Sequence, residues 1–158
     1  MKHLPKHLQP RYRYLAIGIE SWPDATFGRR AFQRACWDAT RALLGDPGSA
    51  AVDPTVLRFD RDGATGRAIL QVRRGTVDEA RAALACVDAV HGDPVGLRVR
   101  GASGTVRACE EKYIRSAPEI TTERTVGFED AERTAVVRDG RADVRLESAF
   151  AGATTLDL

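Results

Sequence analysis

The first third of the chain alternates apolar and other positions in a way that is typical of one strand followed by one helix. In residues 12–20, YRYLAIGIE, every second side chain from Leu15 to Ile19 is aliphatic, which predicts a strand with one buried face. Asp24 is placed to cap a helix that runs to about Leu44. The sequence GDPG then predicts the end of this helix and a loop of roughly ten residues. The expected core stripe of the helix comprises Phe32, Cys36, Ala39 and Leu43.

A hairpin, a second helix and a fourth strand follow. Residues 55–60 and 66–74 predict two strands joined by the loop RDGAT, whose Asp-Gly step is a hairpin signal. The sequence TVDE, beginning at Thr76, is a capping box and predicts a helix that ends at Gly92. Residues 95–100 predict the fourth strand. The inward positions expected for these elements are Leu57, Phe59, Ala68, Leu70, Val72, Val77, Ala80, Leu84, Val87, Val95, Leu97 and Val99.

This order of elements predicts an α+β fold of the ferredoxin-like, RNA-recognition type. Strand, helix, strand, strand, helix and strand build a βαββαβ unit, in which a four-stranded antiparallel sheet carries two helices on one face. Residues 101–105 are expected to form a turn. After the turn, the helical spacing of Val106, Cys109 and Tyr113 predicts a short helix that could cover the other face of the sheet.

The last part of the chain has a weaker pattern and a different charge. Residues 116–158 contain five Arg and nine Asp or Glu, a net charge of −4, whereas the preceding residues carry +6. We therefore assign residues 1–118 to the ferredoxin-like domain and residues 119–158 to an acidic extension. The extension is expected to be a hairpin turning at Asp139-Gly140, followed by a disordered tail from Ala149. The basic domain suits an anionic partner, although an ordinary solvated surface is the alternative.

The sequence predicts no catalytic or metal site. His3, His7 and His91 lack metal-ligand spacing, and there is no glycine-rich phosphate loop, GxSxG elbow or HExxH motif. An odd number of cysteines without CxxC favours reduced thiols in a cytosol. No apolar run approaches the roughly 20 residues that span a bilayer, and the N-terminus does not resemble a secretory signal. We expect a cytoplasmic protein with no membrane contact and no bound metal or cofactor.

The N-terminal arm is the first of three candidate RNA-binding surfaces. Its cations could reach phosphates, and its two tyrosines could stack on unpaired bases. The alternative is that the tyrosines are ordinary packing residues of a covered sheet face. The arm and first strand contribute Lys2, Lys6, Arg11, Tyr12, Arg13 and Tyr14.

The second candidate surface is the outer stripe of the first helix. Arg30, Arg34, Trp37 and Arg41 are spaced four, three and four residues apart, opposite the expected core stripe. A tryptophan among arginines on an exposed face indicates a binding surface for RNA or for a protein partner. In the alternative interpretation, Trp37 packs under the predicted loop that follows the helix.

The third candidate surface is the sheet face away from the two helices. Its arginines could follow a phosphate backbone. Alternatively, the segment after residue 104 covers this face, and the arginines pair with Glu110 and Glu111. The strand over 66–73 reads GRAILQVR and lacks the aromatic residues with which standard RNA-recognition motifs stack bases. The side chains expected here are Arg58, Arg67, Gln71, Arg73, Arg98 and Arg100.

Several of these segments resemble the archaeal ribonuclease P protein component 2 family. The opening MKHLPKHLQPRYRYLAIGIE is similar to the start of that family, as are LRFDRDGATGRAILQVRRG, VDEARAALACVDAV and RVRGASGTVRACEEKYI. The resemblance covers about residues 1–115, and its most specific parts are LPKHL, RYRY and SGTVRACE. Nothing is carried over to residues 116–158.

The resemblance implies a subunit of ribonuclease P, the endonuclease that removes the 5′ leader from precursor tRNA. In such an enzyme the RNA catalyses the reaction with magnesium, and the proteins position and stabilise that RNA. The implied partners are the ribonuclease P RNA, protein component 3 and, within the assembly, a second copy of component 2. Precursor tRNA is the implied substrate of the complex. The isolated polypeptide is expected to be inactive.

Two other function classes remain open at this point. One is a protein-assembly module in which the helix stripe docks a partner. The other is a small-molecule-binding regulatory domain of the same fold, although no apolar pocket is evident in the sequence. The fold alone does not choose among these.

Overall fold

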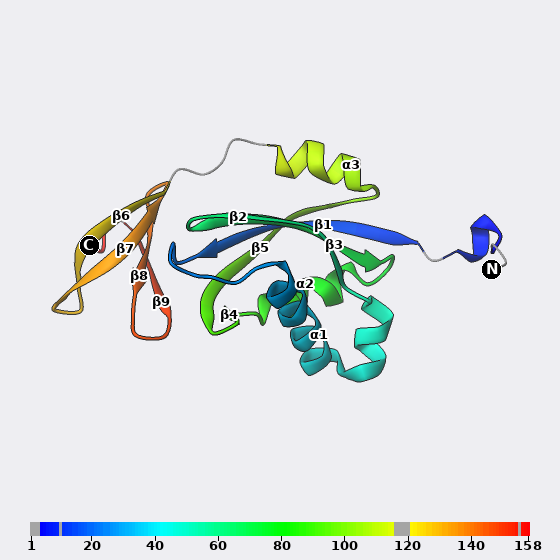
Figure 1. Ribbon diagram of the computed structural model, residues 1–158, viewed down its shortest axis with the longest axis horizontal. Helices are drawn as coiled ribbons and strands as arrows, with labels where there is room; N and C mark the ends of the chain where they lie inside the picture. Colours follow the sequence, from blue (N-terminus) through cyan, green and yellow to red (C-terminus); the bar gives the residue numbers. More distant parts are fainter. Residues whose placement is uncertain (1–3, 10, 116–120, 155) are drawn as a thin grey trace.

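The central element of the molecule is a five-stranded antiparallel sheet. The computed structural model describes residues 4–9, 11–115, 121–154 and 156–158 (Figure 1). The strands lie in the order β2-β3-β1-β5-β4, so the four long ones have the arrangement of a ferredoxin-like βαββαβ unit. This confirms the predicted fold class. The strands are β1 Tyr12–Ser21, β2 Thr55–Asp62, β3 Thr65–Arg73, β4 Ala89–Val90 and β5 Asp93–Ser103.

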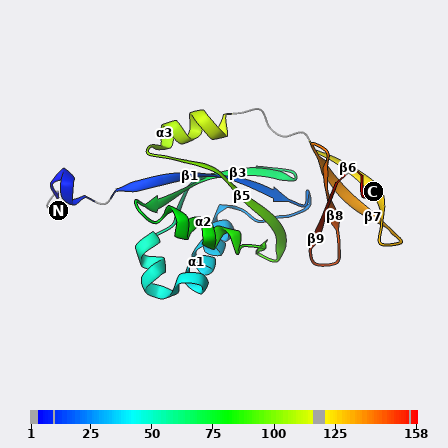
Figure 2. The same cartoon turned by 180° about the vertical axis from the view of Figure 1, so that it is seen from behind.

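Two helices, α1 (Arg29–Val52) and α2 (Val77–Ala85), cover one face of this sheet (Figure 2). The predicted alternation in β1 is correct, since Leu15 and Ile19 are buried in the main core together with Phe32 of α1. Hydrophobic burial of this kind contributes about 1.5 to 3 kcal/mol per large side chain. We call residues 11–115, with this sheet and its helices, the body.

The first helix breaks at Gly45 as predicted, but it starts later than predicted and a further helical segment follows it. It begins at Arg29 after Gly28, so Asp24 is not its cap. The helix breaks at Gly45, where φ is +73°, and resumes with Pro47 in the first turn, where a proline is tolerated because that turn needs no N–H donor. The predicted loop is therefore largely helical, up to Val52.

The predicted core stripe of this helix is also wrong at one position. Leu43 is 46 % exposed. Thr40 is buried instead, and its hydroxyl donates a hydrogen bond to the Cys36 carbonyl at 2.6 Å, which satisfies the polar group inside the core.

The other face of the sheet is partly covered by a short helical segment, as predicted. It consists of α3 (Val106–Cys109) and η2 (Glu110–Ile114), and the Thr105 hydroxyl caps it by accepting from the Ala108 N–H at 3.1 Å. Cys109 packs with Ala16 and Ile69. The Tyr113 ring occupies the space where Gly101 would carry a Cβ, so glycine is required there. The expected turn at 101–105 is shorter than predicted because β5 continues to Ser103.

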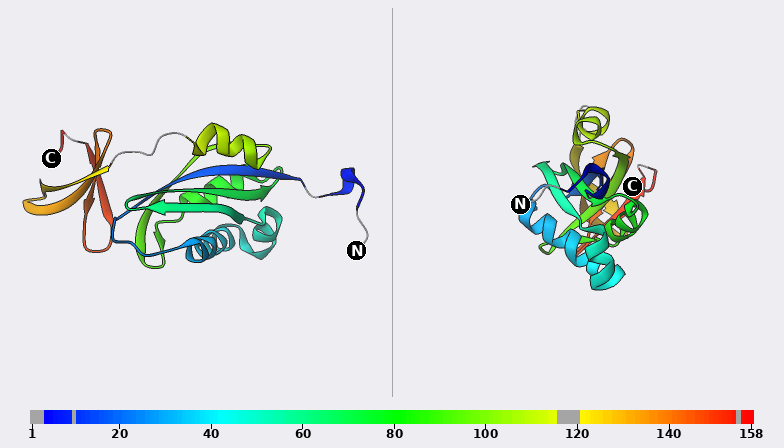
Figure 3. Two further views of the ribbon diagram at one scale, coloured as in Figure 1. Left: turned by 45° about the horizontal axis from the view of Figure 1, so that its top comes forward. Right: turned by 90° about the vertical axis from the view of Figure 1, so that its right-hand side faces the viewer.

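The extension forms a second antiparallel sheet, not a hairpin with a disordered tail. Its strands, in the order β6-β7-β8-β9, are strongly twisted and lie at one end of the molecule (Figures 1 and 3). The predicted turn at Asp139-Gly140 is present, but the segment beyond Ala149 contributes a fourth strand. The assigned boundary at 118/119 lies outside the described residues. The strands are β6 Thr121–Phe128, β7 Ala131–Arg138, β8 Arg141–Arg145 and β9 Phe150–Thr154.

Contacts between distant residues attach the extension to the body. Arg138 is only 2 % exposed and donates to the carbonyls of Ser21 at 3.3 Å and Ala64 at 3.0 Å, while it pairs with Asp143 of its own sheet. The Trp22 and Phe150 rings lie 5.6 Å apart. An ion pair of 3.2 Å joins Arg145 to Asp24. The two sheets therefore share a seam of aromatic, ionic and hydrogen-bonded contacts.

Candidate nucleic-acid interface

The N-terminal arm projects away from the sheet (Figure 1). Lys6, in η1 (Lys6–Leu8), and Arg11 are exposed, as the phosphate-binding prediction requires, whereas Lys2 lies outside the described residues. Arg13 and Tyr12 are half-buried at the start of β1.

The structure distinguishes the two tyrosines of this region. Tyr14 packs against the cluster of Ala16, Ile69 and Cys109 beneath α3, so the packing alternative describes Tyr14 better than base stacking does. Tyr12 is not part of this cluster and is half-buried, so it remains a candidate for base stacking.

The outer stripe of α1 is exposed along its whole length. Arg30, Arg34 and Arg41 are all exposed, and Arg41 pairs with Asp46 at 3.2 Å. The Trp37 indole N–H donates to the Pro54 carbonyl at 2.8 Å, yet the side chain is 48 % exposed. The segment after Gly45 therefore orients the Trp37 ring without covering it, and the stripe remains available to a partner.

Two arginines of the outer sheet face are engaged in ion pairs, and one of these pairs, Arg58 with Glu110, is a pair that the alternative interpretation expects. Arg58 pairs with Glu110 at 2.9 Å and Arg73 with Asp53 at 3.7 Å. Glu111 does not pair with the sheet but with Arg107 of its own helical segment. Arg58 and Arg73 are thus weaker candidates for phosphate contact than the sequence suggests.

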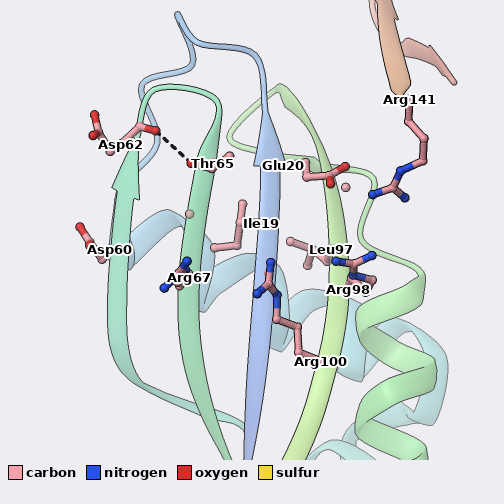
Figure 4. A pocket seen from close by; sticks show the side chains of 13 residues that line it. Ile19, Glu20, Asp60, Asp62, Thr65, Arg67, Leu97, Arg98, Arg100 and Arg141 are labelled. Atoms are coloured by element: carbon pink, nitrogen blue, oxygen red, sulfur yellow. Dashed lines mark hydrogen bonds between the residues drawn. The ribbon is translucent and has the colours of Figure 1, made fainter. Parts of the chain in front are cut away.

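The remaining part of this face forms a groove of about 440 Å³ next to the extension (Figure 4). Strand register places Gly18 between Arg67 and Arg98, and it places Glu20 between Thr65 and Gly96. Because directly opposite residues share a face, these side chains point into one groove. Besides Ile19 and Leu97, whose side chains pack in the main core, its lining residues are Gly18, Glu20, Asp60, Asp62, Thr65, Gly66, Arg67, Gly96, Arg98, Arg100 and Arg141.

Arg141 is a groove residue that sequence reasoning missed. It stands at the start of β8 in the extension, and Figure 4 shows its side chain pointing toward Glu20 and Arg98. No local sequence pattern predicts that Arg141 lies in the groove, because its position depends on how the extension packs against the body. The turn at Asp139-Gly140 indicates only that a strand begins at Arg141.

Charge is unevenly distributed over the groove. On the β2–β3 side, Asp60 lies opposite Arg67, whose guanidinium donates to the Ile114 carbonyl. On the β1–β5 side, no described carboxylate lies within ion-pair distance of Arg98, Arg100 or Arg141. Positive charge therefore accumulates on the side that faces the extension.

The body contains two buried thiols that are poor candidates for a nucleophile. Burial raises the pKa of Cys36 to about 12. Burial, together with the nearby Glu110 carboxylate, also raises the pKa of Cys109. Both thiols are therefore protonated at neutral pH, and the thiolate is the reactive form. Among the described residues, no group of three His, Cys, Asp or Glu side chains could hold a metal ion.

The fold and the candidate site together define an α+β protein of the ferredoxin-like type with arginines exposed on its outer surfaces. Comparison with known proteins identifies its family. The model of the Rpp14/Pop5 family matches residues 13–114, and the chain belongs to this family.

The relatives divide according to how much of the chain they match. Ribonuclease P protein component 2 of Haloarcula marismortui is 62 % identical, over 99 % of each chain. The protein of the same name from Thermococcus gammatolerans is 34 % identical over 72 % of this chain and 91 % of its own. The match to the Haloarcula protein therefore includes the extension. Only 9 % of the Thermococcus protein lies outside its match, which is too short to hold a second sheet of this size.

The fold comparison includes a chain in a cryo-EM structure of yeast ribonuclease MRP. It covers 60 % of this chain and 75 % of the yeast chain, with a TM-score of 0.47 and 14 % identity. In the described part of the chain, no helix combines the length and apolar character needed to cross a membrane.

Proposed function

We propose that this chain is a protein subunit of ribonuclease P, the ribonucleoprotein that removes the 5′ leader from precursor tRNA. One observation carries the proposal: the 62 % identity, over 99 % of both chains, to a ribonuclease P protein component 2. Similarity over the full length means that the body and the extension both match a single subunit of this enzyme.

In this role the polypeptide supports the RNA, and the RNA catalyses cleavage with magnesium. Folded RNA concentrates phosphates, and arginine-rich surfaces neutralise them and release counterions. The exposed arm, the α1 stripe and the groove beside the extension supply such surfaces. The protein itself binds no cofactor in this proposal.

The proposed partners are the ribonuclease P RNA, protein component 3, precursor tRNA as the substrate of the complex, and a second copy of this chain. The α1 stripe is the best candidate for a protein contact. Trp37 is half-exposed and held in one orientation by Pro54, and tryptophan is enriched at the centres of interfaces. The proposed compartment is the cytoplasm.

The test is reconstitution of precursor tRNA cleavage from the RNA and all protein components, with and without this chain. We expect the chain to raise the cleavage rate at limiting magnesium, and we expect the chain alone to cleave nothing. Tagged chain purified from its source cells should also bring down the ribonuclease P RNA. If the chain has no effect on the rate and no such RNA is recovered, the proposal is wrong.

A further inference from the structure

We infer that the groove between the central sheet and β8 binds the sugar–phosphate backbone of RNA, with a phosphate among Arg98, Arg100 and Arg141 and a ribose 2′-hydroxyl at Glu20. The inference rests on the proposed function and assigns part of its RNA binding to this groove. It also makes the extension an RNA-binding element, although the family match to residues 13–114 does not include it.

The floor of the groove lacks side chains at two central positions. Gly18 stands opposite Arg98 and Gly96 stands opposite Glu20, so backbone alone lies between the charged groups. Above Gly18 lies the Arg100 guanidinium, since a Cβ added there would be 3.1 Å from its Nε. The two glycines thus leave room for the Arg100 and Glu20 side chains to lie close to the sheet, where both can face a ligand in the groove.

A β-bulge directs Arg100 into the groove. The β1–β5 pairing passes from Ile17–Val99 to Ala16–Gly101, so Arg100 is the extra residue on its strand. Such bulges re-aim a side chain. The Arg100 Nε is buried and has no hydrogen-bond partner, and no described carboxylate neutralises this guanidinium. An anion in the groove would supply that missing charge.

The extension completes the cluster from the other side. Arg141 is exposed and points toward Glu20 and Arg98 (Figure 4). The neighbouring acid of β8, Asp143, is already paired with the buried Arg138. Three guanidinium groups on two sheets therefore face one carboxylate. Arginine forks of this kind suit phosphate oxygens.

Glu20 gives the cluster a preference for ribose. Its carboxylate lies over Gly96, with its Oε2 3.6 Å from the position of a Cβ at that glycine. A carboxylate repels phosphate but accepts a hydrogen bond from a hydroxyl, and the 2′-hydroxyl distinguishes RNA from DNA. The volume of about 440 Å³ is within the range of small-ligand sites, so a nucleotide fits.

The test measures fluorescence anisotropy of the full-length chain with a labelled single-stranded oligoribonucleotide and with an oligodeoxyribonucleotide of the same base order. We expect Arg141→Gln to weaken RNA binding by about tenfold or more, as loss of one charged hydrogen bond does. The salt slope of log K should fall by about 0.7, as for one phosphate on a single strand. The matched control is Arg124→Gln, an exposed arginine on the same sheet outside the groove, which should change affinity less than about twofold.

A second variant tests the role of the carboxylate. Glu20→Ala removes both the repulsion of phosphate and the acceptor for the 2′-hydroxyl, so DNA binding should gain more than RNA binding and the RNA-to-DNA affinity ratio should fall at least about threefold. Melting temperatures of all variants should match the parent chain, because Arg141 is exposed and Glu20 has no ion pair among the described residues.

The outcomes separate this inference from the proposed function. If the chain supports reconstituted cleavage while Arg141→Gln and Arg124→Gln bind RNA equally well, the groove assignment alone is wrong. If Arg141→Gln weakens binding of a component protein and not of RNA, the groove is a protein site and the inference is overturned. A chain that neither supports cleavage nor binds either oligonucleotide contradicts both.

Discussion

The body and the extension are both antiparallel sheets closed over apolar side chains, but different kinds of contact hold them together. The body has a large continuous core of aliphatic side chains with three phenylalanines, and two helices complete it. The extension has a small cluster dominated by alanine and valine. Its remaining contacts are with the body, through Arg138, Phe150 and Arg145. A small sheet of this kind depends on its neighbour, because it buries too little apolar surface to offset its conformational entropy.

The largest expected difference between the two regions is in their cores. Phe32→Ala should destabilise the body by about 3 to 5 kcal/mol, because Phe32 is fully buried and its removal leaves a cavity. Phe128→Ala, in the half-buried edge of the extension, should cost much less. Urea denaturation followed by circular dichroism measures both changes. A single unfolding transition that both substitutions shift would mean that the two sheets unfold as one cooperative unit.

The second-largest effect is expected at the seam between the body and the extension. Arg138→Ala should weaken docking by about 2 to 3 kcal/mol, because it leaves the Ser21 and Ala64 carbonyls and Asp143 without their buried partner. Amide hydrogen exchange should then accelerate over residues 121–154 while the body stays protected. Arg124→Ala, at an exposed site on the same sheet, is the control. Unchanged protection in the extension would show that Arg138 does not hold it.

Removal of the extension should affect the body less. A chain ending at residue 118 should keep a cooperative melting transition, with a loss of about 1 to 2 kcal/mol, because Trp22 and Ala64 lose apolar cover from Val136 and Phe150. Tryptophan emission should shift to longer wavelength as Trp22 meets water. Loss of the transition would place the extension within the folding unit of the body.

The smallest stability change is expected on the exposed stripe of the body. Trp37→Ala should lower stability by about 1 kcal/mol or less, the value of one hydrogen bond to Pro54. It should weaken assembly with RNA or component 3 by more than about tenfold, as removal of an interface tryptophan commonly does. Calorimetry and pull-down measure the two effects. A large loss of stability with assembly intact would make Trp37 a packing residue.

The pattern of apolar positions in the sequence was enough to predict the four long strands and the two helices of the body in their order, but not β4 or the end of α2 at Ala85. The alternation in β1 and the capping sequence before α2 are local signals, and the order of elements restricts the topology to few choices. The start of α1 was predicted too early, because Asp24 is a common type of helix cap. Residues 46–52 were predicted as a loop, because Gly45 and Pro47 read as a terminator. A proline in the first turn of a new helical segment is compatible with continuation, and the packing of Val52 in the core favours it.

The candidate surfaces were only partly predictable. The exposed stripe of α1 follows from helical periodicity, and its four residues are all on the surface. On the sheet face, periodicity placed the arginines, and the predicted cover by the segment after residue 104 offered Glu110 as a partner for one of them. The pairing of Arg73 with Asp53 was not predicted, because it joins two separate elements and no local pattern encodes it.

The sequence by itself determined the elements of the body, their order and the faces that must be buried, because strand and helix periods act over a few residues. Only the tertiary structure decided that the extension is a four-stranded sheet, that Arg138 is buried at the seam and that Arg141 faces Arg98. The positions of Arg138 and Arg141 depend on contacts between residues separated by more than 40 positions. Their stability comes from matching surfaces and buried hydrogen bonds, which exist only after both sheets have formed.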